Sequence, residues 1–139
     1  MKRILLLVVL LLSGAASAIA GSYNYVEPVQ FRQWLEQGKD MVLVDIQVPA
    51  EFQQHHFKGS LETNVFPIKT ADEKQTLDQL LPKLAATQND VVVVCPRGGG
   101  GAKNTYDYLK EKGVSEKRIF ILKEGMQGWP YQELTVGVK

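Results

Sequence analysis

The chain is organised around one stretch, Val91-Val92-Val93-Val94-Cys95-Pro96-Arg97-Gly98-Gly99-Gly100-Gly101-Ala102. The four valines predict a strand that is buried on both faces. This strand ends at Cys95, the only cysteine of the chain, and a glycine-rich turn then leads into a helical pattern that begins near Ala102. The carboxyl ends of parallel strands, beside helix N-termini, are where α/β proteins bind ligands and hold reactive groups. The stretch therefore predicts a nucleophile at Cys95.

The rest of the chain alternates apolar runs with helical patterns. Each run is continuous rather than alternating, which is typical of strands buried in a parallel sheet with helices on both faces. The sequence thus predicts an α/β fold. Further strands are expected at 25–26, 41–44, 61–65 and 119–122, and helices at 28–37, 49–56, 70–84 with a break at Pro82, and 102–112.

Length and composition indicate one globular domain. The chain has 139 residues, of which 45% are hydrophobic and 22% charged, as is usual for a folded protein with one core. The formal net charge of +1 gives no reason to expect nucleic acid as a partner. We expect the domain to occupy residues 21–139, with its core at about 25–132.

Residues 1–20 resemble a secretory signal peptide. Lys2 and Arg3 precede the apolar run 4–12, and small residues at 16–18 and 18–20 offer two Ala-x-Ala cleavage sites. An uncleaved membrane anchor is the alternative, but the run is shorter than the span of about 20 residues that a membrane helix needs. The sequence predicts export to the periplasm or the exterior, with no stable membrane insertion after cleavage.

The glycine loop gives Cys95 a specific chemistry. Glycines let several backbone N–H groups turn toward one anion, and the following helix adds the positive end of its dipole. Together with Arg97, these groups favour the thiolate, which is the nucleophilic form of cysteine. The alternatives are an inert buried cysteine and a structural or phosphate-binding turn. A Walker loop is excluded because Gly101-Ala102-Lys103-Asn104 lacks the Gly-Lys-Ser/Thr ending.

Two carboxylates and a histidine pair complete the candidate residues. Asp45 ends the strand at 41–44, and we expect Asp45 and Glu51 to support the loop and neighbouring turns through hydrogen bonds. His55 and His56 are adjacent, and adjacent helical residues point in different directions, which is poor geometry for a shared metal. We therefore predict no metal site.

Four motifs in the right order give the chain a resemblance to a known family. Val44-Asp45-Ile46-Gln47 is similar to a strand ending in Asp-Val-Arg, and the segment 51–60 is similar to Glu-Phe-x-x-Gly-His-Ile-x-Gly-Ala. Residues 95–100 correspond to a six-residue active-site loop, and 124–129 to a Glu-Gly-Gly-x-x-x-Trp ending. The chain resembles the single-domain rhodanese sulfurtransferases over most of residues 25–129.

The resemblance implies a five-stranded parallel sheet with helices on both faces and a double-displacement mechanism. Cys95 would take sulfane sulfur from thiosulfate or polysulfide as a persulfide and pass it to cyanide, a thiol, sulfite or a protein. His56 would be a supporting residue, and no metal or organic cofactor is implied. The residues that would bind the donor are those of the loop, namely Pro96, Arg97, Gly98, Gly99, Gly100 and Gly101.

Two departures from the family pattern bear on the substrate. Gly100 occupies the position of the usual loop arginine, and Gln47 that of the arginine in Asp-x-Arg. Losing these cations weakens the binding of dianionic thiosulfate, which favours a polysulfide donor or a persulfide carrier. A non-catalytic sulfur- or anion-binding module is a second hypothesis. A cysteine-dependent phosphatase or arsenate reductase is a third, although Gly101 stands where those enzymes carry an arginine.

Overall fold

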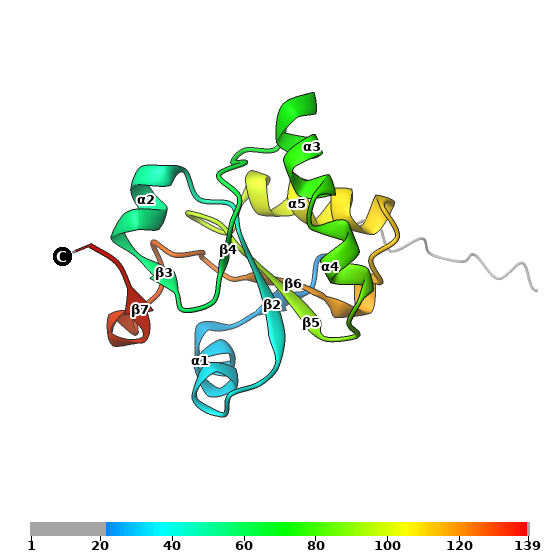
Figure 1. The fold of residues 1–139 in the computed structure, drawn as a ribbon. Coiled ribbons are helices and arrows are strands. Elements are labelled where there is room, and N and C mark those ends of the chain that lie inside the picture. The colour runs from blue at the N-terminus through cyan, green and yellow to red at the C-terminus, as the bar shows by residue number, and fades with distance from the viewer. Residues whose placement is uncertain (1–21, 139) are drawn as a thin grey trace, which may run out of the picture.

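The computed structural model describes residues 22–138, so the predicted signal segment lies outside the described residues. A five-stranded parallel sheet forms the centre of the domain, in the strand order β1-β6-β5-β2-β4. The predicted α/β fold and parallel sheet are confirmed (Figure 1). The main elements are β1 (Tyr25–Val26), α1 (Pro28–Glu36), β2 (Met41–Asp45), α2 (Pro49–Gln54), β3 (His56–Phe57), β4 (Leu61–Glu62), α3 (Ala71–Asp78), α4 (Leu81–Ala85), β5 (Asp90–Val94), α5 (Gly100–Glu111), β6 (Ile119–Leu122) and β7 (Thr135–Val136).

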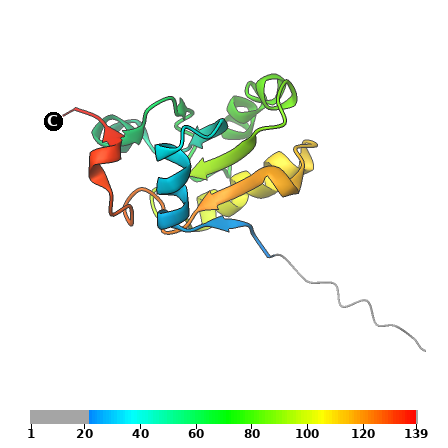
Figure 2. The same cartoon turned by 90° about the horizontal axis from the view of Figure 1, so that it is seen from below.

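The valine strand β5 separates two apolar layers. Val91 and Val93 pack into the layer of α3, α4 and α5, whereas Val92 and Val94 pack into the layer of α1. All four side chains are fully buried, because β5 lies between β2 and β6 and is covered on both faces. Figures 1 and 2 show α1 on one side of the sheet and α3, α4 and α5 on the other.

Local signals set the beginnings of several helices. Thr70 caps α3 through a capping box with Glu73, which satisfies two backbone N–H groups at the helix start. Pro28 and Pro49 each stand in the first turn of a helix, where the missing N–H costs no hydrogen bond. Pro82 lies in the first turn of α4, so the break expected there is the junction between α3 and α4.

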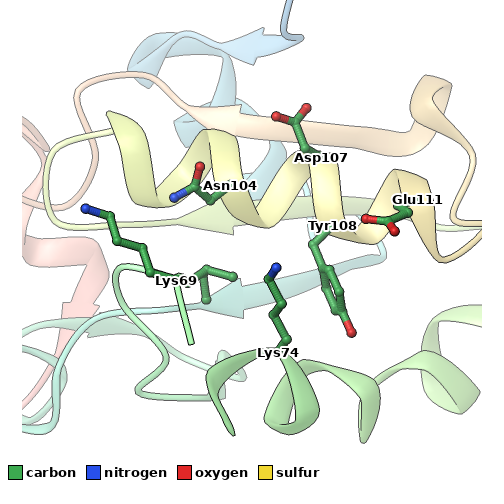
Figure 3. A pocket seen from close by; sticks show the side chains of 7 residues that line it. Lys69, Lys74, Asn104, Asp107, Tyr108 and Glu111 are labelled. Carbon is green, nitrogen blue, oxygen red and sulfur yellow. The ribbon is translucent and has the colours of Figure 1, made fainter. Parts of the chain in front are cut away.

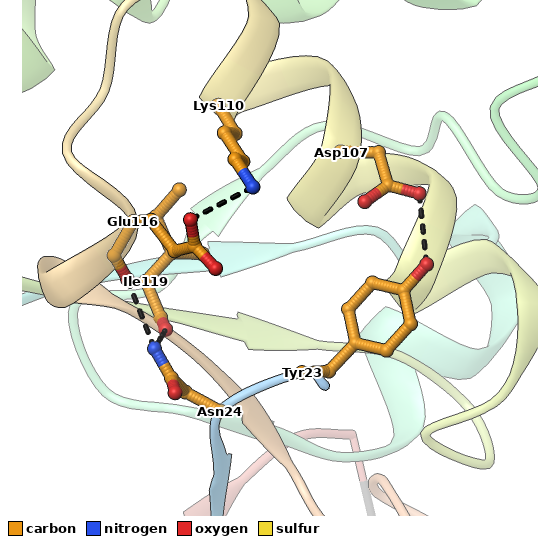
Figure 4. Close-up of polar contacts among 6 residues, drawn as sticks. All are labelled: Tyr23, Asn24, Asp107, Lys110, Glu116 and Ile119. Carbon is orange, nitrogen blue, oxygen red and sulfur yellow. Dashed lines mark hydrogen bonds and ion pairs between the residues drawn. The ribbon is translucent and has the colours of Figure 1, made fainter. Parts of the chain in front are cut away.

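Polar contacts join residues 23 and 24, which precede β1, to α5 and to the segment before β6 (Figure 4). The Tyr23 hydroxyl donates to Oδ2 of Asp107 at 2.9 Å, and the Asn24 amide donates to the carbonyl of Glu116 at 2.9 Å. Lys110 and Glu116 form an ion pair at 2.7 Å. These contacts tie the strand β1 to α5 and to the short 3₁₀ helix η1 (Glu116–Arg118).

Three predicted boundaries were wrong. The helix after the glycine loop, α5, begins at Gly100, two residues before Ala102, so Gly100 and Gly101 are helical. His56 lies in β3 rather than in the preceding helix, since β3 pairs antiparallel with β7. The strand predicted at 61–65 is shorter, because β4 ends at Glu62, and after Trp129 the half-buried and exposed residues of η2 (Gln132–Leu134) lead to β7. Within residues 22–138, every helix is too short or too polar to cross a membrane.

Candidate active site

Cys95 follows directly after β5 and is almost completely buried, with 1% of its surface exposed. Its side chain belongs to the apolar layer of α5, next to Val93 and Ala102. The backbone N–H of Gly98 donates to Sγ at 3.0 Å. Sequence reasoning predicted several such donors, whereas within the described chain this is the one hydrogen bond to Sγ. The next amides, those of Gly100 and Gly101, belong to the first turn of α5.

The conformation of the loop requires glycine at Gly98. Its φ of +70° lies in the left-handed region, and a Cβ there would approach the backbone nitrogen of Glu124 to 2.9 Å. Gly125 is equally constrained, with φ at +63° and no space for a Cβ beside the Cys95 carbonyl. Two opposing glycines thus allow the Cys95 loop and the turn after β6 to pack backbone against backbone.

Backbone hydrogen bonds hold these two segments together. The Met126 N–H donates to the carbonyl of Cys95 at 2.8 Å, and the Gln127 N–H donates to the carbonyl of Pro96 at 2.9 Å. Met126 and Gln127 were not predicted as functional residues from the sequence. The signal that could have found them is the Glu124–Trp129 motif, which was used only to support the family resemblance.

The remaining loop residues differ in how much space surrounds them. Pro96 is buried and Arg97 is exposed. A Cβ at Gly99 or Gly100 would meet no atom within 4 Å. A Cβ at Gly101 would lie 2.6 Å from the Phe66 ring, so this position has no room for a side chain unless Phe66 moves.

Asp45 is completely buried at the end of β2, the neighbouring strand. Its carboxylate accepts hydrogen bonds from the backbone N–H and the side-chain amide of Gln47, at 2.9 and 3.0 Å. Burial raises the pKa of Asp45 to about 6, even though the Gln47 bonds act in the opposite direction. The Asp45 carbonyl accepts from the N–H and the hydroxyl of Thr63 at 3.0 and 2.8 Å. Asp45 is thus hydrogen-bonded to the segment after β2. In the sheet it pairs with Val94, the residue before Cys95.

Glu51 lies in α2 and His56 lies in β3, so neither residue belongs to the Cys95 loop. Within the described chain, no side-chain hydrogen bond joins either residue to 95–101. His56 Nδ1 is 2.7 Å from the Phe52 carbonyl, and its ring stacks on the Phe52 ring at 4.0 Å. Glu51 is half-buried, and its Oε2 has no hydrogen-bond partner among the described residues. The supporting roles of Asp45, Glu51 and His56 stay predictions.

A hollow of about 350 Å³ lies along α5, away from the loop (Figure 3). Side chains of both charges line it, and it includes neither Cys95 nor any residue of the loop. Tyr108 in this hollow donates to Asp78 at 2.7 Å, which raises the pKa of Tyr108 to about 12. The full lining of the hollow is Ile68, Lys69, Lys74, Asn104, Asp107, Tyr108 and Glu111.

In the part of the chain that the structure describes, no three His, Cys, Asp or Glu side chains are grouped to hold a metal ion.

The fold and the site define a parallel α/β domain with a buried thiol at the carboxyl edge of its sheet. The chain belongs to the rhodanese-like domain family, whose model matches residues 27–131. It is also 27% identical over 115 residues to a sulfurtransferase of Allochromatium vinosum, an alignment that covers 81% of this chain and 94% of the relative. The family assignment predicted from the motifs is therefore confirmed.

Solved structures show the same fold around different activities. A yeast protein tyrosine phosphatase of the rhodanese family matches with a TM-score of 0.64 at 18% identity, over 84% of this chain and 94% of that one. A thiosulfate sulfurtransferase from Pseudomonas aeruginosa matches with a TM-score of 0.62 at 20% identity, over 84% and 20%. An As-Sb reductase from Leishmania major matches with a TM-score of 0.59 at 15% identity, over 84% and 86%. At these identities the likeness concerns the fold alone.

Proposed function

We propose that this protein is a sulfurtransferase that carries sulfane sulfur on Cys95. The observation that carries the proposal is the thiol at the end of β5, buried beside the start of α5, with the Gly98 N–H on its sulfur. A backbone N–H that donates to Sγ stabilises the thiolate, which is the attacking form of Cys95 in the proposed reaction. The related sulfurtransferase of Allochromatium vinosum supports the same reaction class.

The proposed reaction has two displacements. The Cys95 thiolate attacks the outer sulfur of thiosulfate or of a polysulfide. The S–S bond of the donor breaks, and sulfite or the shortened polysulfide leaves with the electron pair. An acceptor nucleophile (cyanide, a thiol, sulfite or a protein thiol) then attacks the outer persulfide sulfur, and the Cys95 thiolate is restored. Because Gly100 brings no cation to the loop, polysulfide is the better donor in this proposal.

The geometry favours sulfur transfer over phosphatase or arsenate reductase chemistry. Those reactions need a cation that clamps a tetrahedral oxyanion, which the relatives with longer loops supply from the sixth residue after the cysteine. That residue here is Gly101, which is buried against the Phe66 ring with no space for an arginine side chain. The phosphatase and reductase activities therefore stay with the yeast and Leishmania major proteins.

The cellular setting belongs to the same proposal. The amino-terminal pattern supports export to the periplasm or the exterior, where a small sulfur-containing anion would be the donor. The described domain needs no metal or organic cofactor for the displacements written above. Oligomeric state plays no part in the proposal.

Steady-state kinetics with paired donors and acceptors test this function. We expect sulfur transfer from polysulfide, and more weakly from thiosulfate, to a small thiol or to cyanide, with none in Cys95→Ser. A stable persulfide without turnover, across all acceptors, would instead favour the non-catalytic sulfur-binding module. Hydrolysis of an aryl phosphate that depends on Cys95, without sulfur transfer, would overturn the proposal.

A further inference from the structure

A second hollow, of about 300 Å³, lies at the same edge of the sheet as Cys95. It is formed by the segment after β2, the helix α2, the turn after β6 and the start of η2. The side chains around it are mostly carboxamides, with one carboxylate and one imidazole. They are Gln47, Glu51, Gln54, His55, Met126, Gln127 and Gln132. We call this hollow the glutamine cavity.

The glutamine cavity shares a wall with the Cys95 loop. Met126 and Gln127 line the cavity, and their backbone N–H groups bind the carbonyls of Cys95 and Pro96 at 2.8 and 2.9 Å. Gln47, which also lines the cavity, lies two residues beyond Asp45 at the end of β2, and β2 pairs with β5. A molecule in the cavity is therefore held next to the backbone of the nucleophile.

The charge in the cavity is negative and is not neutralised by the chain. Glu51 is the only carboxylate in the lining, which includes no lysine or arginine. Its Oε2 is shielded from solvent and has no hydrogen-bond partner within residues 22–138. The amide of nearby Gln47 is already donated to Asp45 and to the His55 carbonyl, both at 3.0 Å. A shielded carboxylate oxygen without a donor is costly, so a ligand that brings a cationic donor would be stabilised here.

Two carboxamides in the lining remain able to bind a polar ligand. Gln132 donates its amide to the Trp129 carbonyl at 2.7 Å. By contrast, the side chains of Gln54 and Gln127 form no hydrogen bond with any other described residue. Each carboxamide can both donate and accept, which suits the polar part of a small molecule. The cavity thus combines one anchor for a cation with neutral groups around it.

We propose that the glutamine cavity is an acceptor subsite that binds the ammonium group of a low-molecular-weight aminothiol. This inference rests on the sulfur transfer proposed above. With the ammonium held near Glu51, the acceptor thiolate attacks the outer sulfur of the Cys95 persulfide. The bond between that sulfur and Sγ breaks, its electron pair stays on Sγ, and the acceptor leaves as a persulfide. The thiol proton is lost to solvent, and no external oxidant or reductant is needed.

Single-turnover discharge of the preloaded persulfide tests the subsite. Three probes of similar size differ in charge: cysteamine is cationic, 2-mercaptoethanol neutral and 3-mercaptopropionate anionic. At pH 8, where histidine side chains are ordinarily neutral, rates are compared at equal thiolate concentration. We expect cysteamine to discharge the persulfide about fivefold faster than 2-mercaptoethanol, and 3-mercaptopropionate to be the slowest.

Variants show whether the preference comes from the cavity. Glu51→Gln is expected to bring the ratio of the cysteamine rate to the 2-mercaptoethanol rate to about one, because the charge that favours the ammonium is removed. Gln54→Lys, which adds an ammonium to the lining, should have the same effect and serves if Glu51→Gln does not fold. Glu133→Gln is the matched control, since Glu133 is an exposed carboxylate nearby that does not line the cavity. Equal ratios in the wild type and both cavity variants would overturn the inference.

A binding measurement separates this inference from the proposed function. Ethanolamine carries the ammonium group without a thiol, so its binding does not depend on sulfur transfer. We expect it to shift the side-chain amide signals of Gln54 and Gln127 in NMR spectra of the wild type but not of Glu51→Gln. If the persulfide never forms, the proposed function fails while this result still supports the cation site. If the persulfide forms but ethanolamine produces no shifts, the cavity assignment fails alone.

Discussion

The backbone N–H of Gly98 donates a hydrogen bond to the thiol sulfur of Cys95 at 3.0 Å. This bond depends on a left-handed conformation at Gly98, where φ is +70°. It also depends on the contact between Gly98 and the turn after β6, which leaves no space for a side chain. The hydrogen bond to Sγ therefore depends on Gly98 more than on the other glycines of the loop.

Gly98→Ala tests this dependence. We expect the free energy of unfolding to fall by about 1 to 3 kcal/mol, because the new Cβ forces strain at positive φ and a contact with the Glu124 backbone. Sulfur loading of Cys95 should slow about tenfold as the N–H moves from Sγ. Urea denaturation and the rate of persulfide formation measure the two effects.

Gly100→Ala is the matched control for this substitution. Gly100 is in the same loop, it begins the helix α5, and a Cβ there meets no atom within 4 Å. Stability should change by about 0.5 kcal/mol or less, and loading should be unaffected. Equal effects of the two substitutions would contradict a specific role for Gly98.

Gly100→Arg tests the effect of the missing loop cation on the donor. Gly100 is exposed in the first turn of α5, and its surroundings have open space for a side chain. An arginine there places a positive charge at the mouth of the loop, so the KM for dianionic thiosulfate should fall about tenfold. The KM for polysulfide should change less. Gly100→Gln separates charge from bulk, and an equal fall in KM for that variant would refute the electrostatic explanation.

The raised pKa of Asp45 predicts that the free energy of unfolding depends on pH. Burial raises its pKa from 3.8 to about 6 in the folded chain, so the folded state binds more protons than the unfolded state between these values. The contribution of Asp45 to stability is therefore greatest below about pH 4 and is lost as the pH rises through 6, a change of about 3 kcal/mol. Denaturation between pH 4 and 7 should show this slope in the wild type and not in Asp45→Asn.

Asp40→Asn is the control for the pH dependence. Asp40 is an exposed aspartate just before β2, so its replacement should leave the slope as in the wild type. Parallel stability curves for the wild type and Asp45→Asn would show that the buried carboxylate does not cause the slope.

The sequence allowed the central sheet to be predicted because its strands are continuous apolar runs. Val91–Val94 and Ile119–Leu122 pack on both faces, and such burial leaves a clear pattern. The two-residue strands β3 and β7 leave none, since their pairing depends on the tertiary contact of His56 with Val136. The start of α5 was also placed too late, because glycine has a low helix propensity and only the tertiary structure makes Gly100 helical.

The candidate site could be predicted only in part. The position of Cys95 followed from the valine strand, and the need for glycine followed from the tight turn. The turn that binds the loop was not predicted, because Met126 and Gln127 act through backbone groups that any residue carries. The glutamine cavity was also not predicted, because its lining comes from two segments, 47–55 and 126–132, that are distant in the sequence.

Intact-protein mass spectrometry after exposure to a sulfane donor shows whether Cys95 accepts sulfur. The protein is incubated with polysulfide or thiosulfate at physiological pH, freed of excess donor and weighed beside Cys95→Ser treated in the same way. We expect the mass of one added sulfur atom on the wild type, removed by a small thiol or cyanide, and no added sulfur on Cys95→Ser. An unchanged wild-type mass with both donors would contradict the proposed function.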